Sequence, residues 1–321
     1  MRTSFLNQKK LPVVIEIDDD KALDSIPEAF FEWCCSQRDF LHQKLLEYDA
    51  LLLRGCQAVL TPSDFARFVR EFSGKNLLDY AGGASPRIIL GEGVYTSTEY
   101  PQNLTLSLHN ELSYTYRAPA HLFFYCVVAS QQGGETPLAD SRAIRKNIDE
   151  KVLCEFKSKH IKYVRNLHGG AGLGYSWQEA FETENKRVVE DYCRAGAVCF
   201  QWKDDGGLTL SEVRPATALH PLTGEEVWFN QAEGFHASGM DAETYRLLIL
   251  RMKEEEFRLN SYYGDGTALD LAALNHIRDV TRKETVLVSW QMGDILIVDN
   301  LLAAHGRMPF TGPRKILLAM T

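Results

Sequence analysis

The sequence predicts an α+β protein with a mainly β core, a barrel or jelly-roll sheet decorated with helices. Many short segments either alternate between polar and apolar residues or form brief apolar runs, and turn residues separate them. Capped helical segments lie between several of these strands. The 321 residues contain no internal repeat, low-complexity tract or long linker, so we expect one domain over residues 1–321.

The N-terminal part predicts alternating strands and helices. Residues 11–16 alternate and predict a strand. Ser25 begins a capping box, with a proline inside the first turn and a glutamate three residues later, so we expect a helix from there to about Tyr48. Residues 51–53 predict a buried strand. Thr61 begins a second capping box, and apolar residues at helical spacing follow it.

The middle of the chain predicts the centre of the sheet. Residues 80–102 are rich in Gly, Ser, Thr and Pro and predict a loop that could wall a site. Residues 104–111 alternate as a strand does, and the continuous apolar run 122–128 is typical of a strand buried on both faces. Residues 136–138 resume a strand, and Asp140 is placed to cap a helix.

The C-terminal half continues the mixture. Helices are predicted at residues 176–195, 241–259 and 269–282. Strands are predicted at residues 196–202, 208–219, 226–230, 284–290, 293–300 and 316–320, the last of which we expect to close the sheet.

Composition limits the partners. The net charge of −8 argues against nucleic acid as the main partner. No apolar run approaches the roughly 20 residues that span a bilayer, and residues 1–10 do not have the pattern of a secretory signal. The seven cysteines are scattered without a CxxC motif, which argues against a disulfide framework or a zinc ribbon. We therefore expect a cytoplasmic protein with no membrane partner.

Two histidines and a glutamate could meet at one site. In a strand, His109 and Glu111 project from the same face, about 7 Å apart at the backbone. His305 follows the predicted strand 293–300 and a turn. Two imidazoles and one carboxylate on one face of a metal leave its other positions open, which is the ligand set of non-haem Fe(II) oxygenases. On its own, the His-x-Glu tripeptide is equally compatible with a polar pair on a strand.

Several motifs, taken together, are more specific than that tripeptide. They extend from about residue 50 to the end of the chain and include HNELSY (109–114), GGETPLAD (133–140), DN (299–300), HGR (305–307) and GPR (312–314). Their order and spacing resemble the taurine dioxygenase and clavaminate synthase-like family of Fe(II)/2-oxoglutarate-dependent oxygenases. The resemblance implies a single catalytic domain with a double-stranded β-helix (jelly roll), flanking helices, and inserted helical or lid elements at about 142–290.

The resemblance also implies the cofactor and the co-substrates. Fe(II) would be held by His109, Glu111 and His305, with 2-oxoglutarate and O2 as co-substrates. The distal carboxylate of 2-oxoglutarate suits a guanidinium fork. In this family an arginine placed like Arg314 binds that carboxylate, and a threonine matching Thr136 supports it by a hydrogen bond. Without the resemblance, Arg314 would be interpreted as a surface ion pair and Thr136 as an ordinary strand residue.

The reaction expected from the resemblance is hydroxylation of an unactivated C–H bond, coupled to oxidative decarboxylation of 2-oxoglutarate to succinate and CO2. Glu111 stands where related halogenases carry a small residue, which argues against halogenation; desaturation or cyclisation stays open. The sequence departs from the taurine dioxygenase pattern because no second arginine follows Arg314, so a sulfonate-like substrate is in doubt. Many relatives also carry aspartate where this chain has Glu111.

The motifs are most similar to the biosynthetic branch of the family, whose members act on amino acids or on amino acids tethered to a carrier protein. We therefore expect a small amino-acid-like substrate. Candidate substrate contacts, each of a residue type that is more often core or surface, are Tyr114, Arg165, Arg214, Trp228, Asn230 and Arg307. Arg307 is also an alternative fork for 2-oxoglutarate.

A local excess of basic residues lies in an otherwise acidic chain, at Arg142, Arg145, Lys146, Lys151, Lys157, Lys159, Lys162 and Arg165. We favour the interpretation of a solvated helix face. The alternative is a docking patch for an acidic acyl or peptidyl carrier protein.

Two other classes of protein compete with the oxygenase hypothesis. One is a non-catalytic jelly-roll binding module, and the other is a zinc hydrolase that uses the same three ligands. Neither requires Arg314 or Thr136. Glu233 and His236 have a helical spacing, but the glycine between them and the loop-like context argue against a second metal site, and we expect the remaining histidines to be structural or solvated.

Overall fold

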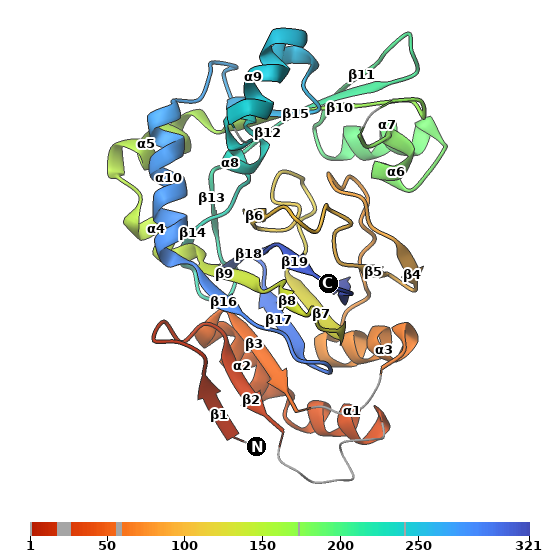
Figure 1. Cartoon of the computed structure of the whole chain (residues 1–321), viewed down its shortest axis with the longest axis vertical. Coiled ribbons are helices and arrows are strands. Elements are labelled where there is room, and N and C mark those ends of the chain that lie inside the picture. Colours follow the sequence, from red (N-terminus) through yellow and green to blue (C-terminus); the bar gives the residue numbers. More distant parts are fainter. Residues whose placement is uncertain (1, 18–26, 56–59, 173, 241) are drawn as a thin grey trace.

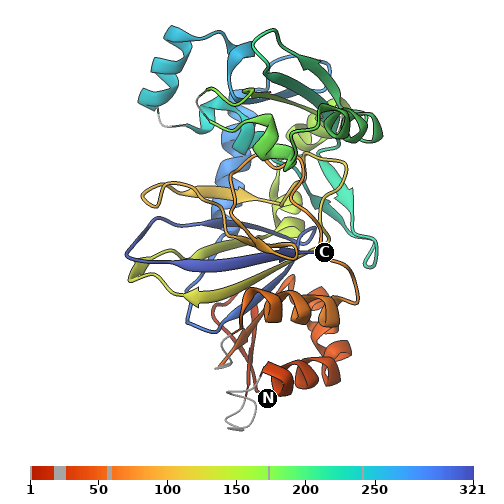
Figure 2. The ribbon, with the colours of Figure 1, turned by 90° about the vertical axis from the view of Figure 1, so that its right-hand side faces the viewer.

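The computed structural model describes residues 2–17, 27–55, 60–172, 174–240 and 242–321. Two sheets at the centre are covered on one side by the N-terminal helices and on the other by a third sheet with its own helices (Figure 1). Figure 2 shows these layers from the side. The prediction of many short strands decorated with helices is confirmed.

The largest sheet has eight strands and is antiparallel except for the parallel pair β2–β3. Its strands in spatial order are β1 (Arg2–Phe5), β2 (Val13–Glu16), β3 (Ala50–Arg54), β17 (Ile295–Asp299), β7 (His121–Val128), β20 (Lys315–Met320), β5 (Val94–Thr96) and β4 (Ile89–Gly91). Alternate residues of β17 belong to different cores: Ile295 and Ile297 face one, and Leu296 and Val298 face the other. Burial on both faces explains the continuous apolar run in this strand. β20 lies inside the sheet, between β7 and β5, rather than closing it.

A four-stranded antiparallel sheet carries the predicted metal ligands. Its strands in order are β16 (Val286–Val288), β9 (Thr136–Asp140), β18 (Ala303–Arg307) and β6 (Leu106–His109). After β17 the chain turns and enters β18, so His305 lies in a strand and not in the loop that the sequence suggested. Residues of both sheets share one apolar core, which fixes them against each other.

Three N-terminal helices pack on the other face of the large sheet. They are α1 (Pro27–Ser36), α2 (Arg38–Tyr48) and α3 (Pro62–Ser73). The capping box at Thr61 is confirmed. The single helix predicted up to Tyr48 is two helices, because the Ser36 hydroxyl donates to the carbonyl of Trp33 where the first helix ends. Ser25, predicted to cap it, lies outside the described residues.

The stretch between residues 142 and 290 adds a second four-stranded sheet and most of the helices. The sheet comprises β11 (Cys199–Trp202), β12 (Leu208–Arg214), β10 (Ile161–Leu167) and β15 (Leu259–Tyr263). The helices are α4 (Ser141–Asn147), α5 (Glu150–Lys159), α6 (Trp177–Phe181), α7 (Lys186–Ala195), α8 (Ala232–Phe235), η1 (Ala237–Gly239), α9 (Ala242–Arg251), η2 (Glu254–Glu256) and α10 (Leu271–Glu284). Two small ribbons pair β13 (Thr217–Leu219) with β14 (Glu226–Trp228), and β8 (Gln132–Gly133) with β19 (Phe310–Thr311).

Two predicted elements of this stretch end early. The strand predicted at 208–219 is divided into β12 and β13 at Pro215, which has no N–H to give to a ladder. The helix predicted to reach Leu259 ends at Arg251, because Leu259 begins a strand that pairs with β10. Asp241, predicted to cap that helix, lies outside the described residues. Within the described ranges, no helix combines the length and apolarity that crossing a bilayer requires.

Candidate active site

His109, Glu111 and His305 come together from two neighbouring strands. His109 ends β6, Glu111 lies in the turn that follows, and β18 places His305 opposite His109 in the register. Oε2 of Glu111 lies 3.7 Å from Nε2 of His305 and 3.9 Å from Nε2 of His109. In the part of the chain that the structure describes, these three residues form the single group of three or more His, Cys, Asp or Glu side chains with converging donor atoms.

The donor set fits a divalent metal. Ligand atoms about 2.1 Å from a shared ion lie at most about 4.2 Å from each other, and both Glu111 distances are below that limit. Nδ1 of His109 lies 2.8 Å from the carbonyl oxygen of Ser107, so a proton on Nδ1 leaves Nε2 free to ligate. Burial lowers the pKa of His305 well below its ordinary value, which keeps the imidazole in the neutral form that a metal binds. Two imidazoles and a carboxylate suit Fe(II).

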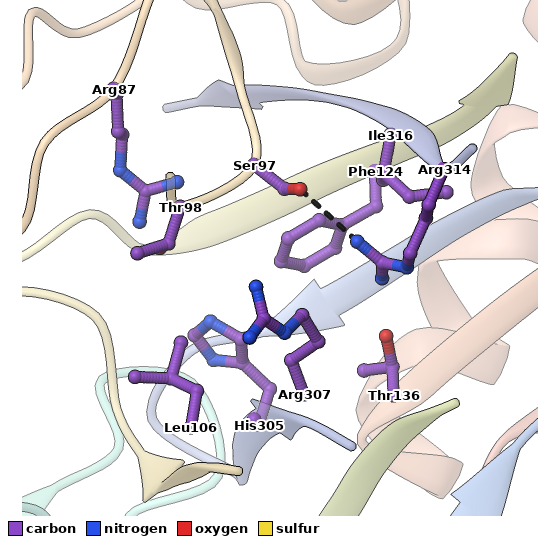
Figure 3. A pocket seen from close by; sticks show the side chains of 11 residues that line it. Arg87, Ser97, Thr98, Leu106, Phe124, Thr136, His305, Arg307, Arg314 and Ile316 are labelled. Atoms are coloured by element: carbon purple, nitrogen blue, oxygen red, sulfur yellow. Dashed lines mark hydrogen bonds between the residues drawn. The ribbon is translucent and has the colours of Figure 1, made fainter. Parts of the chain in front are cut away.

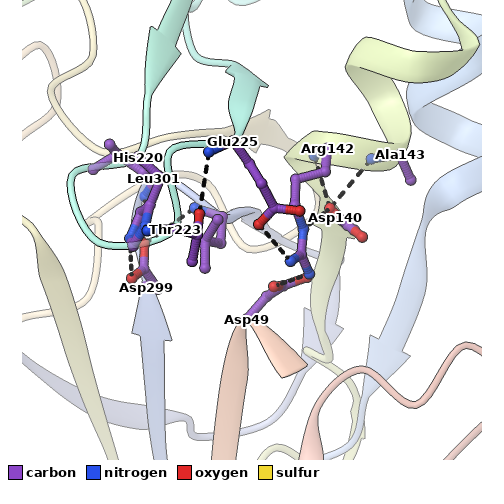
Figure 4. Close-up of polar contacts among 10 residues, drawn as sticks. Asp49, Asp140, Arg142, Ala143, His220, Thr223, Glu225, Asp299 and Leu301 are labelled. Carbon is purple, nitrogen blue, oxygen red and sulfur yellow. Dashed lines mark hydrogen bonds and ion pairs between the residues drawn. The ribbon is translucent and has the colours of Figure 1, made fainter. Parts of the chain in front are cut away.

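Asn300 holds the ligand segment in place. Its Oδ1 accepts a hydrogen bond from the backbone N–H of Glu111 at 2.7 Å, and its Nδ2 donates to the carbonyl of Glu111 at 2.9 Å. The neighbouring Asp299 accepts from the N–H groups of Leu301 and Leu302 and pairs with His220 at 3.0 Å (Figure 4). The turn between β17 and β18 therefore positions both Glu111 and the strand of His305.

A small cavity of about 30 Å³ opens beside His305. Figure 3 shows the side chains around it, with Arg314 and Thr136 on one side and Arg87 on the other. The lining residues are Arg87, Ser97, Thr98, Leu106, Phe124, Thr136, His305, Gly306, Arg307, Arg314 and Ile316. The structure thus brings the two residues predicted for 2-oxoglutarate into the same cavity as a predicted metal ligand.

Arg314 is a half-buried cation that forms no ion pair within the described residues. Its Nε donates to the carbonyl of Gly134 at 3.2 Å, and its Nη1 donates to Oγ of Ser97 at 3.3 Å. Burial, with the nearby Arg307, lowers the pKa of Arg314 to about 10, so the group is still charged at neutral pH. Oγ1 of Thr136 accepts from Nε1 of Trp290 at 3.0 Å. The hydroxyl proton of Thr136 is therefore available for an acceptor in the cavity.

Among the lining residues that sequence reasoning did not single out, Arg87 and Ser97 form hydrogen bonds with predicted site residues, Glu111 and Arg314. Both lie in residues 80–102, which were expected to wall the site but offered no periodicity that singles out a side chain. Nη2 of Arg87 donates to Oε2 of Glu111 at 2.7 Å, and both side chains are only 3% exposed. A charged residue in a stretch otherwise rich in Gly, Ser and Pro was the one available signal.

Arg307 lines the cavity, but both of its terminal nitrogens, Nη1 and Nη2, donate to the loop before β6. Its Nη1 donates to the carbonyl of Tyr100 at 2.9 Å, and its Nη2 donates to those of Pro101 and Leu104 at 2.6 and 3.0 Å. Arg307 therefore ties the loop before β6 to β18.

Arg165 and Arg214, predicted as substrate contacts, lie outside the lining of this cavity and share one carboxylate. Nη2 of Arg165 is 3.3 Å from Oε1 of Glu212, and Nη2 of Arg214 is 2.7 Å from Oε2. Nη1 of Arg165 donates to the carbonyl of Gly82 at 2.6 Å. Their observed contacts stabilise the third sheet and the loop at Gly82, and a contact with substrate stays a prediction.

The other three predicted contacts are also buried away from the lining. The Tyr114 hydroxyl donates to the carbonyl of Gly82 at 3.2 Å. Trp228 packs against the ring of Phe156, with centroids 5.6 Å apart. Nδ2 of Asn230 donates to the carbonyl of Ala216 at 2.8 Å. The structure gives each of them an internal partner.

Comparison with known proteins agrees with this geometry. The taurine catabolism dioxygenase TauD, TfdA family matches residues 27–321. The dapdiamide synthesis protein DdaC of Enterobacter agglomerans is 38% identical over 276 residues, which are 86% of this chain and 83% of that protein. A clavaminate synthase-like protein of Arabidopsis thaliana is 29% identical over 293 residues, 89% of this chain and 85% of that protein.

Solved structures share the fold. PvcB from Pseudomonas aeruginosa has a TM-score of 0.56 at 16% identity, covering 99% of this chain and 90% of its own. PvcB is described as an Fe, alpha-ketoglutarate dependent oxygenase from an isonitrile synthetic pathway. The match over nearly the whole chain and the identity to DdaC establish the relationship. This protein belongs to the TauD/TfdA family of Fe(II)/2-oxoglutarate-dependent oxygenases.

Proposed function

We propose that this protein hydroxylates an unactivated C–H bond of an amino acid or of an amino-acid-derived molecule in a biosynthetic pathway. Two observations carry the proposal together: the donor atoms of His109, Glu111 and His305 converge, and His305 lines the same cavity as Arg314 and Thr136. DdaC, a dapdiamide synthesis protein, and PvcB, from an isonitrile synthetic pathway, support a biosynthetic role.

Each residue has a distinct task in this proposal. His109, Glu111 and His305 hold Fe(II), which supplies the chemistry of O2 activation with 2-oxoglutarate. Arg314 binds the distal carboxylate of 2-oxoglutarate with its guanidinium, and Thr136 donates its hydroxyl proton to the same carboxylate. The protein places the substrate C–H bond at the open side of the metal and limits access of water.

The frame that positions these residues is proposed to be a jelly roll (double-stranded β-helix) in one catalytic domain over 1–321, with 142–290 supplying inserted or lid elements. The supporting observation is that the eight-stranded sheet and the sheet of β16, β9, β18 and β6 share one core, and that His109 and His305 lie on the latter. We also propose a cytoplasmic location, because Cys35, Cys126, Cys154, Cys193 and Cys199 are free thiols, as expected in a reducing compartment.

An anaerobic titration tests the assignment. Addition of Fe(II) and 2-oxoglutarate to the protein should produce a weak visible charge-transfer band, and His109→Ala should abolish it. His160→Ala is the matched control, because this histidine is exposed and ends α5 far from the donor set. In air, a panel of free and carrier-bound amino acids should then stimulate succinate formation. A band that survives in His109→Ala, or no band in the wild type, contradicts the proposal.

A carrier-bound substrate is a further part of the proposal, and the basic stretch is its weakest support. Lys157 pairs with Glu226 at 2.6 Å, and Lys159 pairs with Glu155 at 2.8 Å, so much of their charge is balanced within the chain. Charge reversal at Lys157, Lys159 and Lys162 should lower turnover of carrier-bound amino acids and leave free amino acids unaffected. Unchanged turnover of both forms would rule out docking through this surface.

A further inference from the structure

Arg87 has an unusual charge partner: its guanidinium pairs with a residue that is itself expected to bind the metal. We propose that Arg87 binds a carboxylate of the substrate, so that the substrate is an amino-acid-like molecule with a carboxylate close to the C–H bond that reacts. This inference rests on the proposed function and goes beyond it by naming the group that the site recognises.

The contact with Glu111 uses the oxygen that the metal needs. Nη2 of Arg87 donates to Oε2 of Glu111 at 2.7 Å. The same Oε2 lies nearest the two imidazoles, 3.7 Å from Nε2 of His305 and 3.9 Å from Nε2 of His109. A metal between these donors takes up much of the charge of that oxygen. Arg87 is then left beside a metal-bound carboxylate that can balance it only in part.

No other carboxylate pairs with Arg87 among the described residues. Its side chain is 3% exposed, and its Nε is buried with no hydrogen-bond partner. The other neighbours that affect its charge are the hydroxyls of Tyr80 and Tyr175. A buried guanidinium without an anion is strongly disfavoured, so the loaded site needs another anion at this place.

The charges around the cavity lead to the same expectation. Three guanidinium groups line it, those of Arg87, Arg307 and Arg314. A divalent metal and the two carboxylates of 2-oxoglutarate cancel each other. The three cations then face the single carboxylate of Glu111, and a substrate without a carboxylate would supply no further anion to balance them.

The guanidinium of Arg87 is also suitably held. It lies over the ring of Tyr80, 4.4 Å from the centroid, so it keeps its position without a second acid. Nε and Nη2 form one edge of a guanidinium, and here Nη2 is used while Nε is free. Such an edge matches the two oxygens of a carboxylate. Figure 3 shows Arg87 directed into the cavity from the side opposite Arg314.

If Arg87 only orients Glu111 for the metal, removing the guanidinium should weaken metal binding, whereas our proposal predicts no weakening. Calorimetric titration of Mn(II) into the wild type, Arg87→Gln and Arg87→Lys separates the two roles. We expect Arg87→Gln to bind Mn(II) at least as tightly as the wild type, because a competing cation is removed from Oε2 of Glu111. A tenfold weaker affinity would show a merely orienting residue and overturn the proposal.

The carboxylate itself is tested by thermal shift. The probes are the twenty L-amino acids and their C-terminal amides, added to protein loaded with Mn(II) and N-oxalylglycine. We expect at least one free acid to raise Tm when its amide does not, and this difference should vanish in Arg87→Gln and shrink in Arg87→Lys. The absence of any acid-dependent shift in the wild type, or its persistence in Arg87→Gln, overturns the inference. The charge-transfer band of the wild type with 2-oxoglutarate tests the proposed function independently.

Discussion

Replacing Arg314 with lysine should make the binding of 2-oxoglutarate depend on pH in a range where the wild type is insensitive. Burial and Arg307 lower the pKa of Arg314 from its ordinary value to about 10, so the wild-type cation is intact up to about pH 9. A lysine in the same place starts from an ordinary value of 10.5. Burial and the neighbouring Arg307 should lower its pKa further, toward neutral pH.

The sign and size of the effect follow from charge. The bound carboxylate needs the ammonium form, so affinity is full below the lysine's pKa and is lost as pH rises through it. The Kd for 2-oxoglutarate should then rise about tenfold for each pH unit above the lowered pKa of this lysine. Arg314→Met, which removes the cation altogether, should weaken binding by about 2–5 kcal/mol, or about 30-fold to a few thousand-fold in Kd.

Calorimetric titration of 2-oxoglutarate into anaerobic Mn(II)-loaded protein from pH 6.5 to 9.5 measures this. Lys315→Met is the matched control, because it removes an exposed charge from the next residue and should keep the wild-type profile. An Arg314→Lys variant whose Kd is flat over this range, or an Arg314→Met variant with wild-type affinity, would refute the reasoning.

Three further predictions address the frame of the site. Asn300→Ala should weaken Mn(II) binding about 10- to 100-fold, because Glu111 loses both backbone contacts to this side chain; calorimetry with circular dichroism as the folding control measures it. Burial raises the pKa of Glu233 to about 7, so the free energy of unfolding should fall by up to about 3 kcal/mol as pH rises from about 4.5 to 7. Urea unfolding should show that Glu233→Gln removes this dependence on pH. A dependence retained in Glu233→Gln would contradict the assignment. Thr61→Ala should lower the free energy of unfolding by about 1 kcal/mol through loss of the α3 cap, whereas Ser63→Ala in the same turn should have no comparable effect.

The sequence located the metal ligands because their positions depend on local rules. A strand period of two predicts that His109 and Glu111 lie on one side. A buried run followed by a turn predicts that His305 comes shortly after a core strand. The strand stops at His109, so Glu111 reaches the site from a turn and not from the strand face that periodicity predicted. Glu111 still lies beside His109 and His305, because Asn300 fixes the backbone of Glu111.

Sequence periodicity could not locate residues whose contacts depend on which strand lies alongside or on the course of a loop. Arg165 was expected near the pocket because its strand was expected to face it. The register places Glu212 opposite Tyr163, two residues from Arg165 on the same face, and the guanidinium pairs diagonally with that carboxylate. Periodicity predicts which residues share a face, but not which strand lies alongside. Arg87 reaches Glu111 only through the course of a loop that has no periodicity at all.

Ion pairing separates the arginines that have an internal carboxylate from those that we propose to bind ligands. Arg165 and Arg214 each have Glu212, and they support the fold. Arg314, in contrast, forms no ion pair within the described residues although the chain carries a net charge of −8, so acidic side chains are plentiful. A buried cation left without a carboxylate in an acidic protein lowers stability unless a ligand supplies the anion. Arg87 belongs with Arg314 by this criterion, because the one carboxylate that pairs with it is Glu111, which we propose to bind the metal.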